Sequence, residues 1–254
     1  MENPINRFKV ALREGRPQIG IWNAIPQPMI AELLAGCDFD WVLVDTEHAP
    51  MEVRDVLPAL QAIAAHPVAS AVVRVAINDW VLIKRHLDQG AQSLMVPYVQ
   101  SRQEAEAAVR AMRYPPLGVR GVAGITRASR FGLIADYIAC AEQELCLIVQ
   151  VETRAGLDRL EEIATVEGVD GVFIGPADLA ASLGYPGQSS HPEVIAAIEG
   201  AIARLGAVGV PSGILTSDAA FARRCMALGV GFTALGIDIA LLAHAAAALR
   251  TGIG

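Results

Sequence analysis

The sequence has few aromatic and few charged residues for its length. Of its 254 residues, 5% are aromatic and 19% are charged, whereas about a quarter of the residues in typical soluble domains are charged. Hydrophobic residues make up 53%, so the apolar content is mainly Ala, Val, Leu and Ile. This mixture suits buried parallel strands. We therefore expect a large core and a surface that is partly buried between subunits.

Positive charge is also scarce. The net charge is −7 and no cluster of Lys and Arg is present that could meet nucleic-acid phosphates, so the sequence gives no sign of a nucleic-acid partner. The chain has only two lysines, Lys9 and Lys84, and neither ends a predicted strand. This placement argues against an enzyme that forms a lysine Schiff base with its substrate.

Long apolar runs and paired cysteines are missing too. The N-terminus has no apolar leader, and the longest apolar stretch, 239–249, is interrupted by His244 and is too short to cross a membrane. This length indicates no membrane partner. None of the four cysteines forms a CxxC pair, and we interpret them as reduced residues of a cytoplasmic enzyme. They are Cys37, Cys140, Cys146 and Cys225.

Short β-type runs alternate with segments of helical periodicity. The expected strands are 18–22, 41–45, 71–75, 93–96, 145–151, 171–174, 211–215 and 232–236, and the expected helices include 52–65, 80–88, 102–112, 154–165, 193–205 and 217–228. Eight such units in about 250 residues predict an α/β fold, a (β/α)8 TIM barrel that forms a single domain over 1–254. The alternative is an open doubly wound sheet, but no glycine-rich turn follows the first strand.

Two segments depart from this regular pattern. Prolines and glycines in 113–143 predict a long loop, followed by a helix near 128–142. The last predicted helix, 238–249, is apolar all round, and the outside of a barrel cannot bury such a helix. We therefore expect it to pack against another subunit.

Polar residues end several of the predicted strands, where the active site of a barrel lies. Glu152 and Asp178 end consecutive strands, so their carboxylates can share one divalent cation such as Mg²⁺ or Mn²⁺. Alternatively, Glu152 pairs with Arg154 and Asp178 only caps a helix. We favour the metal because two carboxylates end consecutive strands. The helix that starts near Pro176 also offers free backbone N–H groups for a substrate carboxylate.

Acid–base and pocket residues are suggested by the same rule. His48 follows a strand end three residues after Asp45, which can orient its imidazole for proton transfer. The alternative is a surface histidine paired with Glu47. Arg74 ends an apolar strand and can neutralise Asp45 or Glu47, stabilise an enolate oxygen, or do both. Trp22 and Leu215 either wall a pocket or pack in the core.

Long strings over essentially the whole chain resemble the HpcH/HpaI aldolase family. They are GRPQIG at 15–20, FDW at 39–41, EHAP at 47–50, YPP at 114–116, RGV at 120–122, QVETR at 150–154 and GVDGVFIGPADL at 168–179. The resemblance implies a metal-dependent class II aldolase on a barrel of the pyruvate/phosphoenolpyruvate type. It also implies a homo-hexamer, a trimer of dimers, with exchanged C-terminal helices.

The resemblance further implies a role for each site residue. Glu152 and Asp178 would hold Mg²⁺, Mn²⁺ or Co²⁺, and pyruvate would chelate this metal. Its carboxylate would also meet the amides of Ala177 and Asp178, with Gln150 beside the substrate. His48 would be the base, supported by Asp45, and Arg74 would stabilise the enolate. Asp88 matches a family residue that reaches the histidine of a neighbouring subunit.

The resemblance implies reversible cleavage of 4-hydroxy-2-oxo acids, such as 4-hydroxy-2-oxoheptanedioate, into pyruvate and an aldehyde such as succinate semialdehyde, in aromatic catabolism. The sequence departs from close relatives at Thr46, 75–77, 124–126 and 215–217, and these changes leave the aldehyde open. The alternatives are an aldolase for 2-keto-3-deoxy sugar acids, hydroxypyruvate as the donor, a lyase of malyl or citramalyl thioesters, and a metabolite-binding protein without turnover. No group of basic residues suited to a CoA tail is evident.

Overall fold

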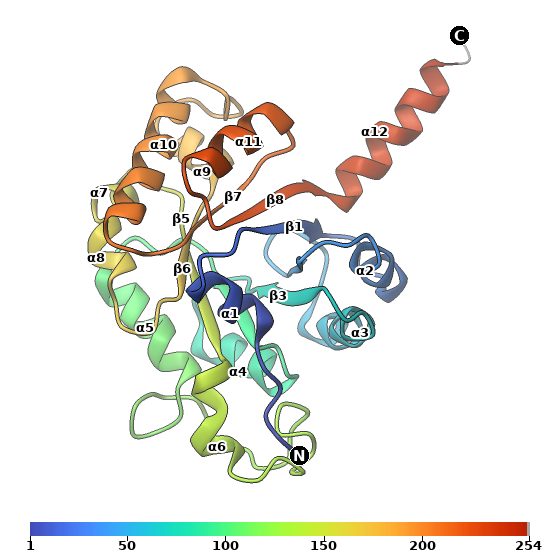
Figure 1. Cartoon of the computed structure of the whole chain (residues 1–254), viewed down its shortest axis with the longest axis vertical. Coiled ribbons are helices and arrows are strands. Elements are labelled where there is room, and N and C mark those ends of the chain that lie inside the picture. Colours follow the sequence, from blue (N-terminus) through green and yellow to red (C-terminus); the bar gives the residue numbers. More distant parts are fainter. Residues whose placement is uncertain (253–254) are drawn as a thin grey trace.

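Eight parallel strands close into one barrel in chain order, with β8 pairing back to β1 (Figure 1). This computed structural model describes residues 1–252. The closed barrel confirms the predicted (β/α)8 fold and excludes the open doubly wound sheet. The strands are β1 Gln18–Asn23, β2 Trp41–Asp45, β3 Ser70–Arg74, β4 Ser93–Val96, β5 Cys146–Val151, β6 Gly171–Ile174, β7 Ser212–Leu215 and β8 Phe232–Ile237.

Helices surround this barrel, and most lie where periodicity predicted them. Two short helices, α1 and α2, were not predicted, and the segment predicted as one helix over 154–165 is divided at Arg159, whose backbone is not helical. The helices are α1 Arg7–Arg13, α2 Pro28–Ala35, α3 Val53–Ala64, α4 Trp80–Asp88, α5 Arg102–Met112, α6 Tyr137–Cys140, α7 Arg154–Asp158, α8 Leu160–Ala164, α9 Pro176–Ser182, α10 Pro192–Ala207, α11 Ala219–Ala227 and α12 Asp238–Thr251, with a 3-10 turn at Ala141–Glu144.

The prediction of a helix near 128–142 is wrong over most of that range. Only α6 and the 3-10 turn are helical there. Arg130, Phe131 and Asp136 have φ of 51°, 59° and 55°, a left-handed conformation that cannot continue a right-handed helix. The segment instead folds as a loop over a small cluster of its own. This cluster contains Tyr114, Ala128, Ile134, Tyr137 and Ala141.

The barrel interior is apolar along most of its height. Alternate residues of each strand point inward, and large side chains such as Trp41, Phe173 and Phe232 fill the space. Gly20 lies against the Trp41 ring and Gly213 against the Phe232 ring, so neither position has room for a Cβ atom. The inward side chains are therefore packed into a solid core, and a ligand can reach only the ends of the barrel.

The inward alternation continues into polar residues at the carboxyl ends of the strands. In β2 the inward series runs from Trp41 and Leu43 to Asp45, and in β3 it runs from Val72 to Arg74. In β5 the same period of two places Gln150 inward. The candidate site is thus the last layer of the barrel interior, and strand register fixes its side chains.

Helix α12 extends away from the barrel (Figure 1). Its leucines are exposed, with Leu242 at 61% and Leu249 at 74%. This exposure agrees with the expected apolar surface, but a subunit that covers it stays a prediction. No helix within residues 1–252 is long and apolar enough to cross a membrane.

Candidate active site

Arg74 is the centre of a buried ion-pair network at the carboxyl ends of β2 and β3. Asp45 lies directly opposite Arg74 in the strand register. Arg74 donates from Nε to Asp45 Oδ1 at 2.8 Å and from Nη2 to Asp45 Oδ2 at 2.7 Å. Its Nη1 lies 2.9 Å from Glu47 Oε2. Both carboxylates that the sequence offered as partners of Arg74 are therefore its partners.

Trp22 lies below this network in the barrel core. Its side chain is 2% exposed and packs against the rings of Trp41 and Phe173. The guanidinium carbon of Arg74 lies 5.3 Å from the centre of the Trp22 ring, which allows a cation–π interaction. Trp22 is thus a core residue whose ring supports Arg74 from beneath.

Glu152 continues the inward series of β5 and is 2% exposed. The main-chain amide of Tyr98 donates to its Oε1 at 2.8 Å, and Gln150 donates from Nε2 to its Oε2. Within residues 1–252 no ion pair joins Glu152 to Arg154, whose amide instead donates to the Ser182 hydroxyl. Glu152 is therefore oriented by neutral donors, and its negative charge has no cationic partner in this part of the chain.

Asp178 lies in the first turn of α9, immediately after β6. Gly175 precedes this helix, and a Cβ atom at Gly175 would lie 2.8 Å from Glu152 Cβ and 3.1 Å from Gln150 Nε2. Because Gly175 has no side chain, Glu152 has room beside the start of α9. The amides of Ala177 and Asp178 belong to the first turn, where backbone N–H groups have no partner within the helix.

The carboxyl groups of Glu47, Glu152 and Asp178 interact with one another. Burial raises the pKa of Glu47 to about 7, with further increases from Asp45 and Asp178 and an opposing decrease from Arg74. Burial likewise raises the pKa of Glu152 to about 7, and the charges of Glu47 and Asp178 add to this rise. Burial thus dominates both shifts, and the neighbouring carboxylates add to them.

This donor set fits a divalent cation. No group of three or more His, Cys, Asp or Glu side chains within residues 1–252 forms a ready-made metal cage. Mg²⁺, however, is usually bound through one or two carboxylates, with substrate and water in the remaining positions. Glu152 and Asp178 can supply those carboxylates, and a cation between them would favour the ionised form of Glu152 against burial and against the charges of its neighbours.

His48 lies at the rim of this site. Its side chain is 64% exposed, and its Nε2 lies 3.9 Å from Glu47 Oε1. Asp45 Oδ1 accepts hydrogen bonds from the main-chain amides of Glu47, at 3.0 Å, and of His48, at 3.4 Å. Asp45 therefore contacts the main chain of His48 and not, as the sequence suggested, its imidazole.

Leu215 and Ala177 line a mainly apolar pocket of about 590 Å³ beside this site. Ala240, Leu241 and His244 of α12 form another part of its wall.

Asp88, in contrast, ends α4 at the opposite end of the barrel, where Arg120 Nη2 lies 2.8 Å from its Oδ1. Asp88 therefore does not join the site of its own chain.

The sequence did not predict two contributors to the site, the carboxyl group of Glu47 and the main-chain amide of Tyr98. Glu47 was considered only as a partner of His48 or Arg74, and its place in the same strand-end string was the available signal. The Tyr98 contribution is a main-chain amide. Such a donor is independent of residue type, so no sequence pattern could have indicated it.

Comparisons with known proteins identify the family of the chain. A sequence profile of the family described as HpcH/HpaI aldolase/citrate lyase matches residues 18–245. A pyruvate aldolase of Rhizobium etli is 62% identical over 98% of both chains, and a hydroxypyruvate/pyruvate aldolase of Sagittula stellata is 55% identical over 98% of both. A 4-hydroxy-2-oxo-heptane-1,7-dioate aldolase of Escherichia coli is 52% identical, over 98% of this chain and 95% of its own.

A solved structure has the same fold along the whole chain. The HpcH/HpaI aldolase/citrate lyase family protein of Burkholderia cenocepacia is 40% identical and superposes with a TM-score of 0.94, over 98% of this chain and 99% of its own. The family profile covers most of the chain, and several relatives above 50% identity cover nearly all of it. The chain therefore belongs to the HpcH/HpaI aldolase/citrate lyase family and is a carbon–carbon lyase.

Proposed function

We propose that this enzyme is a divalent-metal-dependent class II aldolase that reversibly cleaves 4-hydroxy-2-oxo acids into pyruvate and an aldehyde. The observation that carries the proposal is the pair Glu152 and Asp178, whose carboxylates interact while no Lys or Arg among residues 1–252 forms an ion pair with Glu152. The names of the relatives support pyruvate as a product and 4-hydroxy-2-oxoheptanedioate, which would also yield succinate semialdehyde, as the first substrate to test. One relative's name also supports hydroxypyruvate as a second donor.

Glu152 and Asp178 would hold the metal, which we propose to be Mg²⁺, Mn²⁺ or Co²⁺. When bound, it would polarise the 2-oxo oxygen of the substrate as a Lewis acid. The substrate carboxylate would accept hydrogen bonds from the amides of Ala177 and Asp178 at the start of α9. The Gln150 amide, which already contacts Glu152, would lie beside the bound substrate.

Arg74 would stabilise the negative charge that develops on the enolate oxygen. A guanidinium has five N–H donors, and two of them donate to Asp45, while Nη1 forms an ion pair with Glu47. The remaining donors are fixed by the same ion pairs and need no rearrangement when charge appears. Such preorganised donors are an efficient source of transition-state stabilisation.

His48 would act as the general base. It would remove the proton of the 4-hydroxyl group as the C3–C4 bond breaks, the aldehyde would leave, and protonation of C3 would give pyruvate. Its exposed position at the rim suits a group that must reach the far end of a substrate. Leu215, in the adjoining apolar pocket, would contact the substrate. Asp45 would position His48 through the main chain.

We further propose a cytoplasmic homo-hexamer, a trimer of dimers, in which α12 packs on a neighbouring subunit. The exposed leucines of α12 support such packing. Because Asp88 lies at the opposite end of its own barrel, it could approach a catalytic histidine only in another subunit. A place in aromatic catabolism follows if 4-hydroxy-2-oxoheptanedioate is the physiological substrate.

The test is pyruvate release from 4-hydroxy-2-oxoheptanedioate with added Mg²⁺ or Mn²⁺, repeated after EDTA. We expect release that requires the metal and stops with EDTA. A parallel panel of 2-keto-3-deoxy sugar acids and of malyl and citramalyl thioesters separates the alternative substrates. Release that is unchanged in metal-free enzyme would contradict the proposal.

A further inference from the structure

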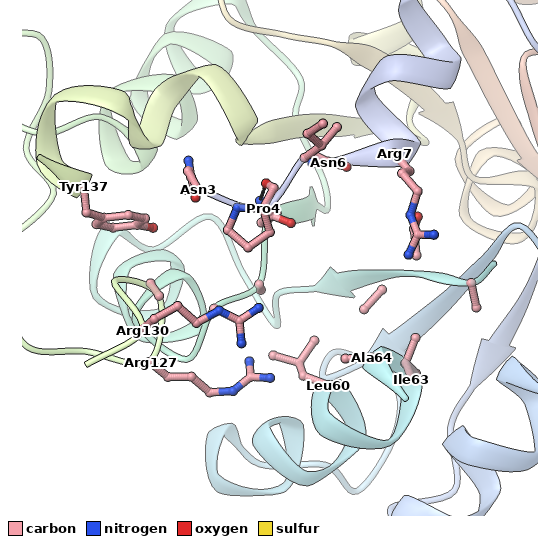
Figure 2. Close-up of a pocket in the computed structure, with 18 residues that line it drawn as sticks. Asn3, Pro4, Asn6, Arg7, Leu60, Ile63, Ala64, Arg127, Arg130 and Tyr137 are labelled. Carbon is pink, nitrogen blue, oxygen red and sulfur yellow. Dashed lines mark hydrogen bonds between the residues drawn. The ribbon is translucent and has the colours of Figure 1, made fainter. Parts of the chain in front are cut away.

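A second cavity lies at the amino ends of the strands, opposite the candidate active site. It has a volume of about 250 Å³ and is enclosed by the N-terminal segment 3–7, by α3 and by the loop that contains Arg127 and Arg130 (Figure 2). Ser70 and Ala71, which begin β3, and Gln92, which precedes β4, form part of its wall. The cavity is therefore separated from Glu152 by the packed interior of the barrel.

The cavity is lined by arginines and by no acidic residue. Arg7, Arg127 and Arg130 are the only charged residues among those that line it. Figure 2 shows the guanidinium groups of Arg127 and Arg130 close together and turned toward the cavity. Burial lowers the pKa of Arg127, and the nearby charge of Arg130 lowers it further. Two cations are thus held together without an anion.

No carboxylate of the described chain neutralises this pair. Neither Arg127 nor Arg130 forms an ion pair with any of residues 1–252, and Asp88, which lies nearby on α4, is engaged by Arg120. Arg7 donates to the carbonyl oxygen of Pro67. The side-chain amide nitrogen of Asn3, another lining residue, is buried and has no partner among the described residues.

The local backbone holds Arg127 in place. Its Nη1 donates to the carbonyl oxygen of Gln89 at 2.7 Å. Gly90 has a φ of 91°, which favours glycine, and a Cβ atom there would lie 2.8 Å from Arg127 Nη1. On the other side of the cavity, Gln92 donates to the Pro4 carbonyl at 2.6 Å and so ties down the N-terminal segment. The arginine is therefore fixed against the main chain.

We propose that this cavity binds a small oxyanion, a phosphate or a short dicarboxylate, between Arg127 and Arg130. Guanidinium groups bind both anions through paired, charge-assisted hydrogen bonds. Leu60, Ile63 and Ala64 form an apolar wall suited to a short carbon chain. This ligand would be distinct from the substrate, and the inference does not depend on the proposed function.

The test is calorimetric titration of metal-free enzyme in chelator-free buffer at constant ionic strength, with sodium phosphate and disodium succinate in separate arms. The variants are Arg130→Gln, which removes an exposed cavity arginine, and Arg127→Lys, which retains charge but not the paired donors. Arg223→Gln is the matched control, since Arg223 is an exposed arginine of α11. Arg74→Lys reports on anion binding at the catalytic end.

We expect wild type, Arg223→Gln and Arg74→Lys to bind at least one anion alike, and Arg130→Gln and Arg127→Lys to bind it about tenfold or more weakly. Binding of phosphate alone identifies a phosphate site, and binding of succinate alone identifies a dicarboxylate site. Circular dichroism would check that each variant is folded. The proposal is overturned if neither anion binds wild type at millimolar concentrations, or if folded Arg130→Gln and Arg127→Lys bind the anion as tightly as wild type does.

Discussion

At the carboxyl ends of the strands, Glu152 and Asp178 lie beside Arg74, which is already paired with Asp45 and Glu47. At the amino ends, a cavity is lined by arginines and by no acidic residue. Glu47 and Glu152 both have a pKa raised to about 7, and Arg127 has a lowered pKa. Both ends therefore hold buried ionisable groups of one sign, and neither Glu152 nor Arg127 has an oppositely charged partner among residues 1–252. The comparison teaches that each end suits a ligand of the opposite sign, a divalent cation at one and an oxyanion at the other.

Each end also depends on a glycine beside its charged group. At the catalytic end, Gly175 leaves room for Glu152, and its φ of −86° is open to any residue, so only space requires glycine. At the amino end, Gly90 leaves room for Arg127 and also has a positive φ. Substitutions at these two positions should therefore affect opposite ends of one molecule, one by crowding and the other by crowding and strain.

His48→Ala tests the catalytic end with the largest expected effect. Loss of a positioned general base should lower the rate of pyruvate release by about 10²–10⁴-fold. Mn²⁺ affinity should stay the same, because His48 is not a proposed ligand. His66→Ala, a histidine near the amino ends, is the control for steady-state kinetics. A rate like that of wild type would remove His48 from the mechanism.

Gly175→Ala and Gly90→Ala make a matched pair. Displacement of Glu152 by a Cβ atom at position 175 should lower kcat/KM by about 10²-fold, the scale of a misplacement near 1 Å. Gly90→Ala should leave kcat/KM close to that of wild type. Kinetics of both variants at saturating Mn²⁺ provide the measurement, and an equal loss in both would break the distinction between the two ends.

Glu152→Gln should change how stability depends on pH in metal-free enzyme. A carboxyl group whose pKa rises on folding binds its proton more tightly in the native state, so its contribution to stability is lost as pH rises from about 4.5 to about 7. Glutamine cannot ionise, so the variant should be more stable than wild type at pH 8, by at most about 3 kcal/mol.

This difference should shrink toward pH 5. Burial lowers the pKa of His86 to about 4, but His86 is present in both proteins and its contribution cancels in the comparison. Glu47, whose charge interacts with Glu152, is relieved of that charge in the variant, which changes the stability at pH 8 in the same direction. Urea unfolding at both pH values provides the measurement. A difference that is independent of pH would show that Glu152 does not titrate in this range.

Gly90→Ala should have the smallest effect on the molecule as a whole. A side chain at a positive φ costs about 1–3 kcal/mol of folding free energy, and the contact with Arg127 adds to this cost. Unfolding in urea would measure the loss, and phosphate titration would show whether anion binding weakens with it. Unchanged stability and unchanged binding would contradict the role given to Gly90.

The catalytic end could be predicted largely from the sequence because strands are local patterns. The period of two that brings Trp41 and Leu43 inward also brings Asp45 inward, and register then sets Arg74 opposite it. The burial of Glu47 could not be predicted, because it depends on the closing of the barrel around Arg74.

The amino end could not be predicted for a different reason. The sequence predicts a loop up to Arg127 and a helix near 128–142, and neither Arg130 nor Phe131 is a residue type that signals the positive φ found there. The loop conformation accompanies packing on Tyr114 and Tyr137, which belong to a small cluster within the same irregular segment and not to a periodic pattern. Only the folded loop brings the two arginines together.

Calorimetric titration of metal-free enzyme with Mn²⁺ tests the central claim that the carboxyl ends of the strands form a cation site. The comparison is wild type, Glu152→Gln and Glu162→Gln, in which the control removes an exposed carboxylate of α8 with the same change in charge. We predict equal affinity for wild type and Glu162→Gln, and affinity weaker by about tenfold or more for Glu152→Gln, because a charged ligand is lost. Equal Mn²⁺ affinity in all three proteins would contradict the account.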